Sequence, residues 1–376
     1  MSPRSSDLLQ TVDRIASDVV ARHAVSVDIE AEFPAASVGA LAQAGALGAL
    51  SAEDVGGQGL GLRAAAQIVE RVARECGSTA MVLVMHFCGA AVIEKYGPEK
   101  IRRQVATGEH LSTLAFSEAG SRSHFWVPVS TAAKKNGHIV LDAEKSWVTS
   151  AHKAAAYVWS SKPVAAEGLS TIWLVPSDRS GLTVEGEFNG LGLRGNDSSP
   201  VRAIQVEIPE SNRLGEDGRG FDIMMQDVLP VFQILSTACS AGLMEGATQR
   251  AASHTGGMAY GYSGAKLAEL PTIRNYIARM RTKTDMVHAL LQDTLHAIEN
   301  GRPDAMLRVL ESKAAAGETS TEVLDLAMRV CGGQAFRKDV GVERYFRDGR
   351  AAGVMAPTTD VLYDFIGKAA CGMELF

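Results

Sequence analysis

The sequence predicts a mostly α-helical protein with a β domain at its centre, and three observations support this fold class. Apolar side chains recur every three or four positions through much of residues 1–110, as they do in amphipathic helices. Within residues 111–220 that period disappears, and short β-branched and aromatic runs alternate with turn residues. The helical period returns in residues 221–376. We therefore expect three domains with these boundaries: a helical domain, a compact antiparallel β domain and a bundle of four long helices.

In the first domain, proline and glycine residues separate the expected helices. Phe33-Pro34 interrupts the helical pattern, and a glycine-rich turn begins near Gly56. One segment is apolar on nearly all faces, which predicts that it is buried between neighbours. That segment is residues 79–95, and the other helices are expected over residues 7–24, 36–47, 62–74 and 98–107.

In the central domain, side chains alternate as they do in half-buried strands. The stretch from Ile139 to Thr149 alternates apolar and polar residues and carries a β-branched and aromatic bias. Turn residues such as Asn136-Gly137 separate the runs. Strands are expected near residues 139–141, 156–160, 170–175, 182–185 and 201–208.

The third domain contains four long apolar-periodic segments with short connections, which is the pattern of a helical bundle. The break at Gly332-Gly333 lies between the last two helices. These helices are expected over residues 222–250, 270–300, 303–329 and 358–371.

Composition narrows the class of protein. A net charge of −6 and a pI near 5.9 argue against a nucleic-acid partner, which needs a concentrated basic face. We see no apolar run near the roughly 20 residues of a membrane span and no signal peptide, so we expect no membrane contact and a cytoplasmic protein. The five cysteines show no metal-ligand spacing, so we expect buried free thiols and no metal site.

The stretch from residue 114 to 151 concentrates the polar groups of the central domain. The hydroxyl groups of Ser117, Ser123 and Thr149 can hydrogen-bond a flat heteroaromatic ligand, and Trp147 can cover its face. Alternatively, these are ordinary strand residues, with Trp147 as a core aromatic side chain. The residues alone leave both interpretations open.

Four separated motifs resemble the acyl-CoA dehydrogenase family. Residues 117–124 resemble its Ser/Thr-Glu-Pro, Gly, Ser-Asp pattern, and residues 143–150 resemble its Gly-x-Lys-x-Trp-Ile-Thr-Asn strand. Residues 332–336 resemble its Gly-Gly-x-Gly-Phe motif, and residues 343–348 match its Glu-Arg-x-x-Arg-Asp motif. The resemblance implies an N-terminal helical domain, a small β-barrel and a C-terminal four-helix bundle.

The same resemblance implies FAD as the cofactor, an acyl-CoA or acyl carrier protein-bound substrate, and a homodimer or homotetramer. Its electron acceptor would be an electron-transfer flavoprotein or oxygen. Two positions depart from the family's cofactor contacts: Tyr260 stands where the family has an arginine, and Arg329 where it has a glutamine. The residues expected to bind the cofactor are Phe116, Ser117, Ser123, Trp147, Thr149, Gly332, Gly333, Thr358 and Asp360.

The family's catalytic base is missing from its expected places. The turn that carries a glutamate in most members has Ala356, and the alternative helix position has Phe232. A general base must lie within hydrogen-bond reach of the proton that it removes, and neither side chain can accept one. Asp360 is a candidate replacement, although an acid that caps a helix start is the plainer interpretation. The catalytic base is therefore unassigned.

Three functions follow. The first is an FAD-dependent oxidoreductase of acyl thioesters that acts on a CH–CH or CH–OH bond in a specialised or biosynthetic pathway rather than plain fatty-acid β-oxidation. The second is a flavin-dependent monooxygenase of the same fold, whose chemistry needs no carboxylate at residue 356. The third is a non-catalytic subunit that binds an acyl group or completes an oligomer.

Overall fold

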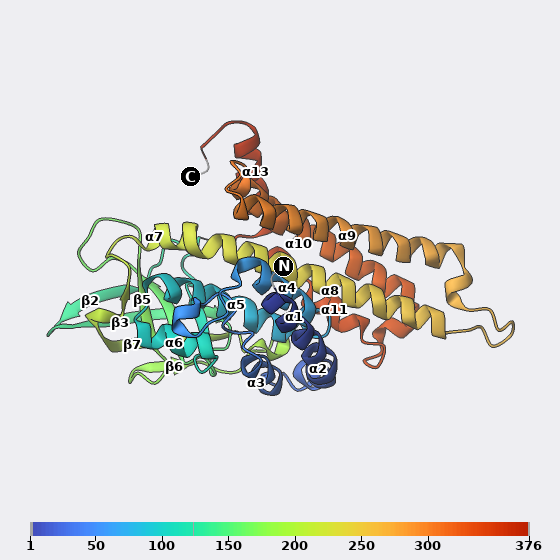
Figure 1. Cartoon of the computed structure of the whole chain (residues 1–376), viewed down its shortest axis with the longest axis horizontal. Coiled ribbons are helices and arrows are strands. Elements are labelled where there is room, and N and C mark those ends of the chain that lie inside the picture. Colours follow the sequence, from blue (N-terminus) through green and yellow to red (C-terminus); the bar gives the residue numbers. More distant parts are fainter. Residues whose placement is uncertain (1–2, 123, 375–376) are drawn as a thin grey trace.

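The computed structural model describes residues 3–122 and 124–374, and its helical, β and helical parts follow one another along the chain (Figure 1). This organisation confirms the predicted fold class. A one-turn π-helix at Ala16–Val20 joins the first two helices, so the first predicted helix is longer than expected. The N-terminal helices are α1 Pro3–Ile15, α2 Ala21–Ile29, α3 Ala35–Gln43, α4 Gly61–Ala73, α5 Gly77–Tyr96 and α6 Glu99–Thr107.

Helix α5 lies in the core of the protein. Its apolar residues face the N-terminal helices, the first strand and the C-terminal helices at once. Two segments of the described chain, α5 and Gly220–Gly257, have the length and apolar composition of a membrane span, but most of each is buried inside the fold. The expectation that no apolar run approaches that length is wrong for both segments, and their burial inside the fold explains their composition.

The central domain consists of two four-stranded sheets. In one sheet the order is β1 Ser112–Ala115, β4 Ala156–Ser161, β5 Thr171–Pro176 and β8 Arg213–Leu214; in the other it is β2 Thr131–Lys135, β3 His138–Val148, β7 Ser199–Pro209 and β6 Leu182–Val184. All pairs are antiparallel except β1 with β4, where Leu114 lies opposite Val158. The wholly antiparallel expectation is wrong for this pair, because the chain passes through β2 and β3 in the other sheet before it returns as β4.

A separate apolar core fills the space between the two sheets. Trp159 and Trp173 face each other across β4 and β5 and are completely buried. Every residue of β4 is buried, whereas β7 mostly alternates between buried and exposed positions. Strand β4 therefore lies inside the domain, and β7 has one face toward the outer surface.

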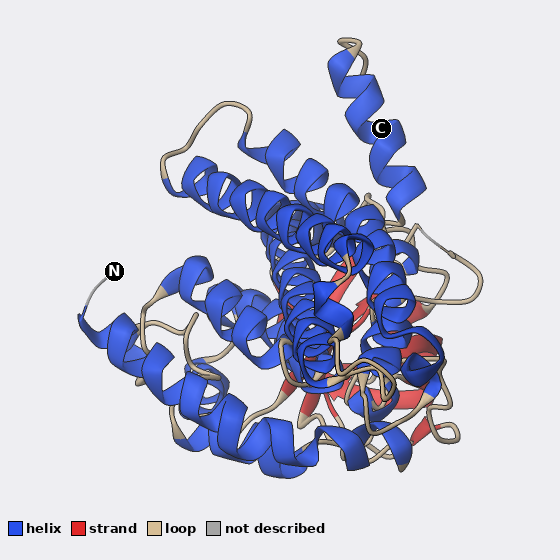
Figure 2. Cartoon of the chain, turned by 90° about the vertical axis from the view of Figure 1, so that its right-hand side faces the viewer, coloured by secondary structure: helices blue, strands red, loops and turns tan. Residues whose placement is uncertain are grey.

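The C-terminal domain is built on three long helices that pack side by side, α8, α9 and α10, with α4 against α8 (Figure 1). The last helix, α13, instead contacts α10 at its base and projects from the body (Figure 2). Two short helices, α11 and α12, were not expected from the sequence. The bounds are α7 Gly220–Ile223, α8 Leu229–Gly257, α9 Pro271–Glu299, α10 Ala305–Cys331, α11 Val342–Asp348, α12 Ala351–Val354 and α13 Thr359–Ala370.

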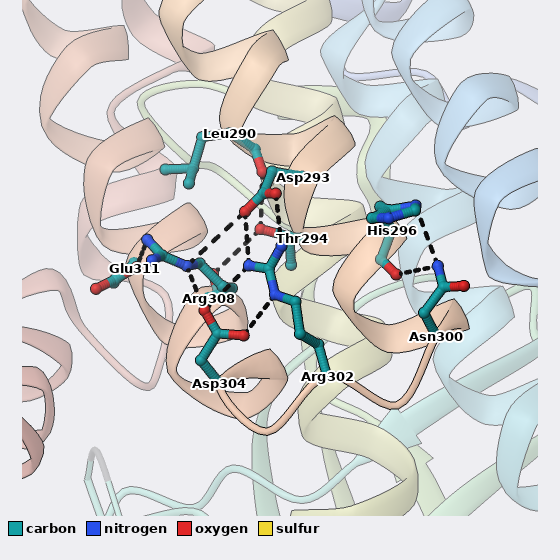
Figure 3. Close-up of polar contacts among 9 residues, drawn as sticks. All are labelled: Leu290, Asp293, Thr294, His296, Asn300, Arg302, Asp304, Arg308 and Glu311. Atoms are coloured by element: carbon teal, nitrogen blue, oxygen red, sulfur yellow. Dashed lines mark hydrogen bonds and ion pairs between the residues drawn. The ribbon is translucent and has the colours of Figure 1, made fainter.

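An ion-pair network closes the connection between α9 and α10 (Figure 3). The guanidinium group of Arg302 donates to both oxygens of Asp293, at 2.8 and 2.9 Å, and to Asp304. Arg308 donates to Asp304 at 3.0 Å. Hydrogen bonds from Arg302 lower the pKa of Asp304 to about 2. The network fixes the antiparallel reversal and so helps to set how α10 lies against α9.

Candidate active site

A cavity of about 930 Å³ lies where the three domains meet. Helix α5 contributes Met81 and Met85 to its wall, the β domain contributes Phe116 and its neighbours, and α8 contributes Leu229 and Phe232. Its lining is mostly apolar. A volume of this size and an apolar wall with few polar groups are typical of small-molecule and cofactor sites.

Four of the predicted cofactor residues meet in this cavity. Phe116 and Ser117 follow the end of β1, and Trp147 and Thr149 lie at the end of β3. The backbone N–H of Ser146 donates to the carbonyl of Ser117 at 2.9 Å, which ties the two segments together. Residues far apart in the sequence thus form one wall because β3 runs beside the chain that leaves β1.

Trp147 is not a core residue. Its side chain is 69 % exposed and lines the cavity, and its backbone has a left-handed φ of 57°. A register shift between Lys145 and Val148 in the β3–β7 pairing frees it from the ladder. Its ring meets Phe188 edge to face, with the centroids 6.4 Å apart. A bulky residue held at positive φ is uncommon, and here it presents an aromatic face to the cavity.

Polar groups on the same wall are available to a ligand. The hydroxyl groups of Thr149 and Ser198 lie 3.0 Å apart and share one hydrogen bond. Asn196 is 2 % exposed and lines the cavity, and its Oδ1 atom accepts no hydrogen bond within the described part of the chain. A buried acceptor without a donor costs free energy unless a ligand or water satisfies it. The wall therefore offers an aromatic face and polar atoms that fit the flavin ring of FAD.

Glu118 contributes a carboxylate beside the cavity, but its oxygens are already used. Its carboxylate accepts hydrogen bonds from Ser130 Oγ at 2.6 Å, from the backbone N–H of Val129 at 2.6 Å and from Lys145 Nζ at 2.5 Å. Burial alone would raise the pKa of Glu118, but the Lys145 ammonium holds it below its usual value. Burial lowers the pKa of Lys145 to about 8 against the opposing effect of Glu118. Both are charged at neutral pH, and the pair fixes the wall rather than serving a ligand.

Both positions expected for a catalytic base line the cavity. Phe232 reaches it from α8, and Ala356 from the turn that follows α12. Among the described lining residues, Glu118 is the only carboxylate. Within residues 3–122 and 124–374, the lining therefore includes no carboxylate without a partner.

Three arginines line the same cavity. Arg347 is neutralised by Asp28 and Glu343. Arg122 and Arg350 have no carboxylate partner within residues 3–122 and 124–374, and the guanidinium of Arg350 lies 4.3 Å above the ring of Phe346. The cavity thus retains positive charge at its wall.

The loop at residues 190–196 is held against α11. A side chain at Gly192 would come within 2.5 Å of the backbone of Arg347, so only glycine permits this approach. The Asp348 carboxylate accepts a hydrogen bond from the backbone N–H of Leu193 at 2.6 Å. Burial raises the pKa of Asp348 to about 6, although Leu193 and Arg344 favour its charged form.

Four of the remaining predicted cofactor residues do not line this cavity. Thr358 caps α13, where its hydroxyl accepts from the backbone N–H of Val361 at 3.4 Å, and Asp360 is exposed in the first turn of that helix. Gly332 and Gly333 are exposed at the end of α10. Ser123 lies outside the described residues.

Sequence reasoning missed several residues of the site. Met81 and Met85 line the cavity without belonging to any motif. Asn196 belongs to the 191–198 loop, which resembles the family's Gly-x-Arg-x-Ser loop but was not expected to bind the cofactor. Arg350 lies two residues beyond the Arg-Asp pair that ends the 343–348 motif, and this position is the signal that could have found it. The cysteines are free, but the expectation that all are buried is wrong for Cys371, which is exposed near the end of the last helix. No group of three His, Cys, Asp or Glu side chains within the described ranges is placed to hold a metal ion.

Comparisons with known proteins agree with this architecture. The N-terminal, middle and C-terminal domain models of acyl-CoA dehydrogenase match residues 2–108, 113–206 and 218–371. The short-chain specific acyl-CoA dehydrogenase of human mitochondria is 30 % identical over 363 residues, which cover 94 % of this chain and 87 % of that protein. The cyclohex-1-ene-1-carbonyl-CoA dehydrogenase of Geobacter metallireducens is 26 % identical, with 96 % of each chain covered.

A solved structure shows the same fold. Butyryl-CoA dehydrogenase from Megasphaera elsdenii superposes with a TM-score of 0.92 at 20 % identity, and 99 % of each chain is covered. The sequence matches extend over nearly the whole chain, and the structural match includes all three domains. The chain belongs to the acyl-CoA dehydrogenase family and is an FAD-dependent oxidoreductase.

Proposed function

We propose that this protein oxidises an acyl thioester without a protein carboxylate at residues 356 or 232, in a specialised or biosynthetic pathway rather than plain fatty-acid β-oxidation. The observation that supports this is the cavity wall: Ala356 and Phe232 both line it, and the only carboxylate among its described residues is held by Lys145. A positioned general base contributes about 10²–10⁴-fold to a rate. Ordinary α-proton abstraction would therefore be slow in this cavity.

The cofactor would lie against the wall formed by Phe116, Ser117, Trp147 and Thr149, with Asn196 Oδ1 as a further polar contact. When bound, FAD supplies the two-electron acceptor that takes a hydrogen from the substrate as hydride. The assignments of Ser123, Gly332, Gly333, Thr358 and Asp360 to the cofactor site stay predictions.

A substrate with a CH–OH bond suits this cavity better than one with two CH bonds. Oxidation of an alcohol carbon releases an O–H proton, which is more acidic than the α C–H proton of a thioester and can pass to water. The absence of a carboxylate at Ala356 would then not slow the reaction. Oxygenation by the bound flavin is the second candidate, because it also needs no carboxylate at this position.

The carrier is CoA or an acyl carrier protein, and the electron acceptor is an electron-transfer flavoprotein or oxygen. Arg122 and Arg350 leave positive charge at the cavity wall, which favours a ligand that bears phosphate groups. FAD and both thioester carriers meet that description. The cytoplasmic location expected from the sequence stays a prediction.

We propose a homodimer or homotetramer. Tyr262, in the connection after α8, is 87 % exposed, and Phe336, after α10, is 84 % exposed. The α8–α9 connection extends beyond the helices at the right-hand end of Figure 1. Large exposed aromatic side chains are typical of interfaces. Light scattering of the wild-type protein and of F336E tests this; an unchanged monomer in both contradicts it.

The test of the catalytic proposal begins with the visible spectrum of the purified protein, which should show bound flavin. Anaerobic bleaching by CoA-linked and carrier-linked acyl and hydroxyacyl thioesters then identifies the substrate. The A356E variant should gain desaturation of butyryl-CoA that the wild-type protein lacks. The matched control is A36E, which adds the same acid at an exposed position of α3 and should change nothing.

Each contrary result removes a definite part of the proposal. A colourless protein would leave the non-catalytic subunit as the function. Oxygen consumption that requires an external reductase would favour the monooxygenase. Efficient desaturation of butyryl-CoA by the wild-type protein would show that a base acts from elsewhere.

A further inference from the structure

Lys313 is a buried lysine without a carboxylate partner. It lies on α10, its side chain is 1 % exposed, and within the described part of the chain no acid pairs with it. Burial lowers its pKa to about 7. A buried amine is costly unless its hydrogen-bond donors are satisfied, so its partners indicate what it stabilises.

All three hydrogen-bond partners of Lys313 are backbone carbonyls of one short segment. Its Nζ atom donates to Pro357 O at 2.8 Å, to Met355 O at 2.9 Å and to Ala352 O at 3.3 Å. The segment comprises the end of α12 and the turn after it, where carbonyl groups have no partner within the helix. A lysine near a helix C-terminus satisfies such groups and complements their partial negative charge.

The segment that Lys313 holds is a wall of the cavity. Val354, Met355 and Ala356 line it, and Ala356 lies between two of the carbonyl groups that Lys313 binds. On its other side, the Lys313 ammonium lies 5.8 Å from the ring centroid of Phe232, the facing wall residue on α8. The lysine thus links both positions at which a family base was expected.

The close approach of this segment to α10 depends on small residues as well. A side chain at Gly317, one turn beyond Lys313, would come 2.8 Å from Thr359 Oγ1 and 3.5 Å from the backbone of Gly353. Gly317 and Lys313 therefore face the same segment from one side of α10. The glycine allows contact, and the lysine supplies the hydrogen bonds.

We propose that Lys313 is a positioning residue, which fixes the 352–357 segment so that the cavity keeps the width an acyl thioester needs between residue 356 and Phe232. This inference rests on the proposed acyl-thioester function. Lys313 itself does not contact the cavity and takes no part in proton transfer.

The test uses K313M, which keeps the length of the side chain and removes its donors. Amide hydrogen exchange within residues 352–357 should quicken about tenfold or more, the effect of losing hydrogen bonds to a charged group. The KM for the best acyl thioester should rise about tenfold, with kcat changed less than about threefold, because a loose wall weakens binding more than chemistry. K313Q, which retains two N–H donors, should restore part of both values.

The matched control is K283M. Lys283 lies on α9 and pairs with Glu322 of α10, away from the segment, so exchange and KM should match the wild-type protein. Wild-type exchange in folded K313M, or loss of kcat at unchanged KM, would overturn the proposal. If K313M does not fold, K313Q is judged by the same two criteria. Absence of any acyl-thioester turnover in the wild-type protein would defeat the proposed function, while the exchange comparison still decides the role of Lys313.

Discussion

The buried pair of Glu118 and Lys145 gives the strongest stability prediction. Their side chains are 1 % and 0 % exposed, and the Glu118 carboxylate also accepts hydrogen bonds from Ser130 Oγ and from the backbone N–H groups of Val129 and Ser130. In E118Q, the amide keeps the shape but leaves the Lys145 ammonium without its counter-charge. Breaking one partner of a buried pair costs about 3–5 kcal/mol. We expect a loss of that size in the free energy of unfolding.

Urea unfolding followed by circular dichroism measures this loss. The control is E210Q, which makes the same change in the exposed pair of Glu210 with Lys134 and should leave the midpoint unchanged. The double variant E118M/K145M removes both charges and should recover much of the stability lost in E118Q, since no uncompensated charge remains. A loss below about 1 kcal/mol in E118Q, or a double variant no more stable than the single one, would refute the reasoning.

Two further predictions concern the cavity wall. The raised pKa of Asp348, about 6, means that the folded state binds more protons than the unfolded state between its ordinary pKa and pH 6. The free energy of unfolding of the wild-type protein should therefore exceed that of D348N most at acid pH. This difference should decline by up to about 1.4 kcal/mol per pH unit as the pH rises to 6. A difference in urea midpoints that does not change with pH would contradict this. W147L should lower the affinity for FAD about tenfold, because it removes an aromatic face from the cavity wall. The unfolding midpoint should not change, because Trp147 is 69 % exposed. Flavin absorbance per protein measures the affinity change, and full flavin retention in W147L would count against this wall as the FAD site.

Long periodic segments could be predicted from the sequence with good accuracy. Helix α4 begins at Gly61, within two residues of its predicted start, because apolar periodicity over several turns is a local signal. Helix α5 begins at Gly77, also within two residues of its predicted start, because a long segment that is apolar on nearly all faces is a local signal too. Strand β1 was missed because four residues carry no readable alternation and its partner, β4, lies 41 residues further along the chain. The short helices α11 and α12 were missed because segments of seven and four residues are too short to show a helical period.

The cavity residues likewise include some that the sequence predicted and some whose environment only the structure decided. The motif residues Phe116, Ser117, Trp147 and Thr149 were predicted to lie together, and the structure brings them to one wall. The sequence left open whether Trp147 is a core residue, because an aromatic residue in a strand pattern is usually buried. A register shift in the β3–β7 pairing decided its exposure, and register is set by two strands rather than one.

The order of amino acids alone determined the helical and β regions, the family and the absence of an acid at residues 356 and 232. Those features depend on local periodicity and on which side chain occupies a position. Only the tertiary structure decided that Glu118 forms a buried ion pair with Lys145 and that Lys313 hydrogen-bonds the wall segment at residues 352–357. From the sequence alone, a lysine on an amphipathic helix is expected to be solvated. Whether neighbouring elements exclude water from it depends on how the whole chain packs.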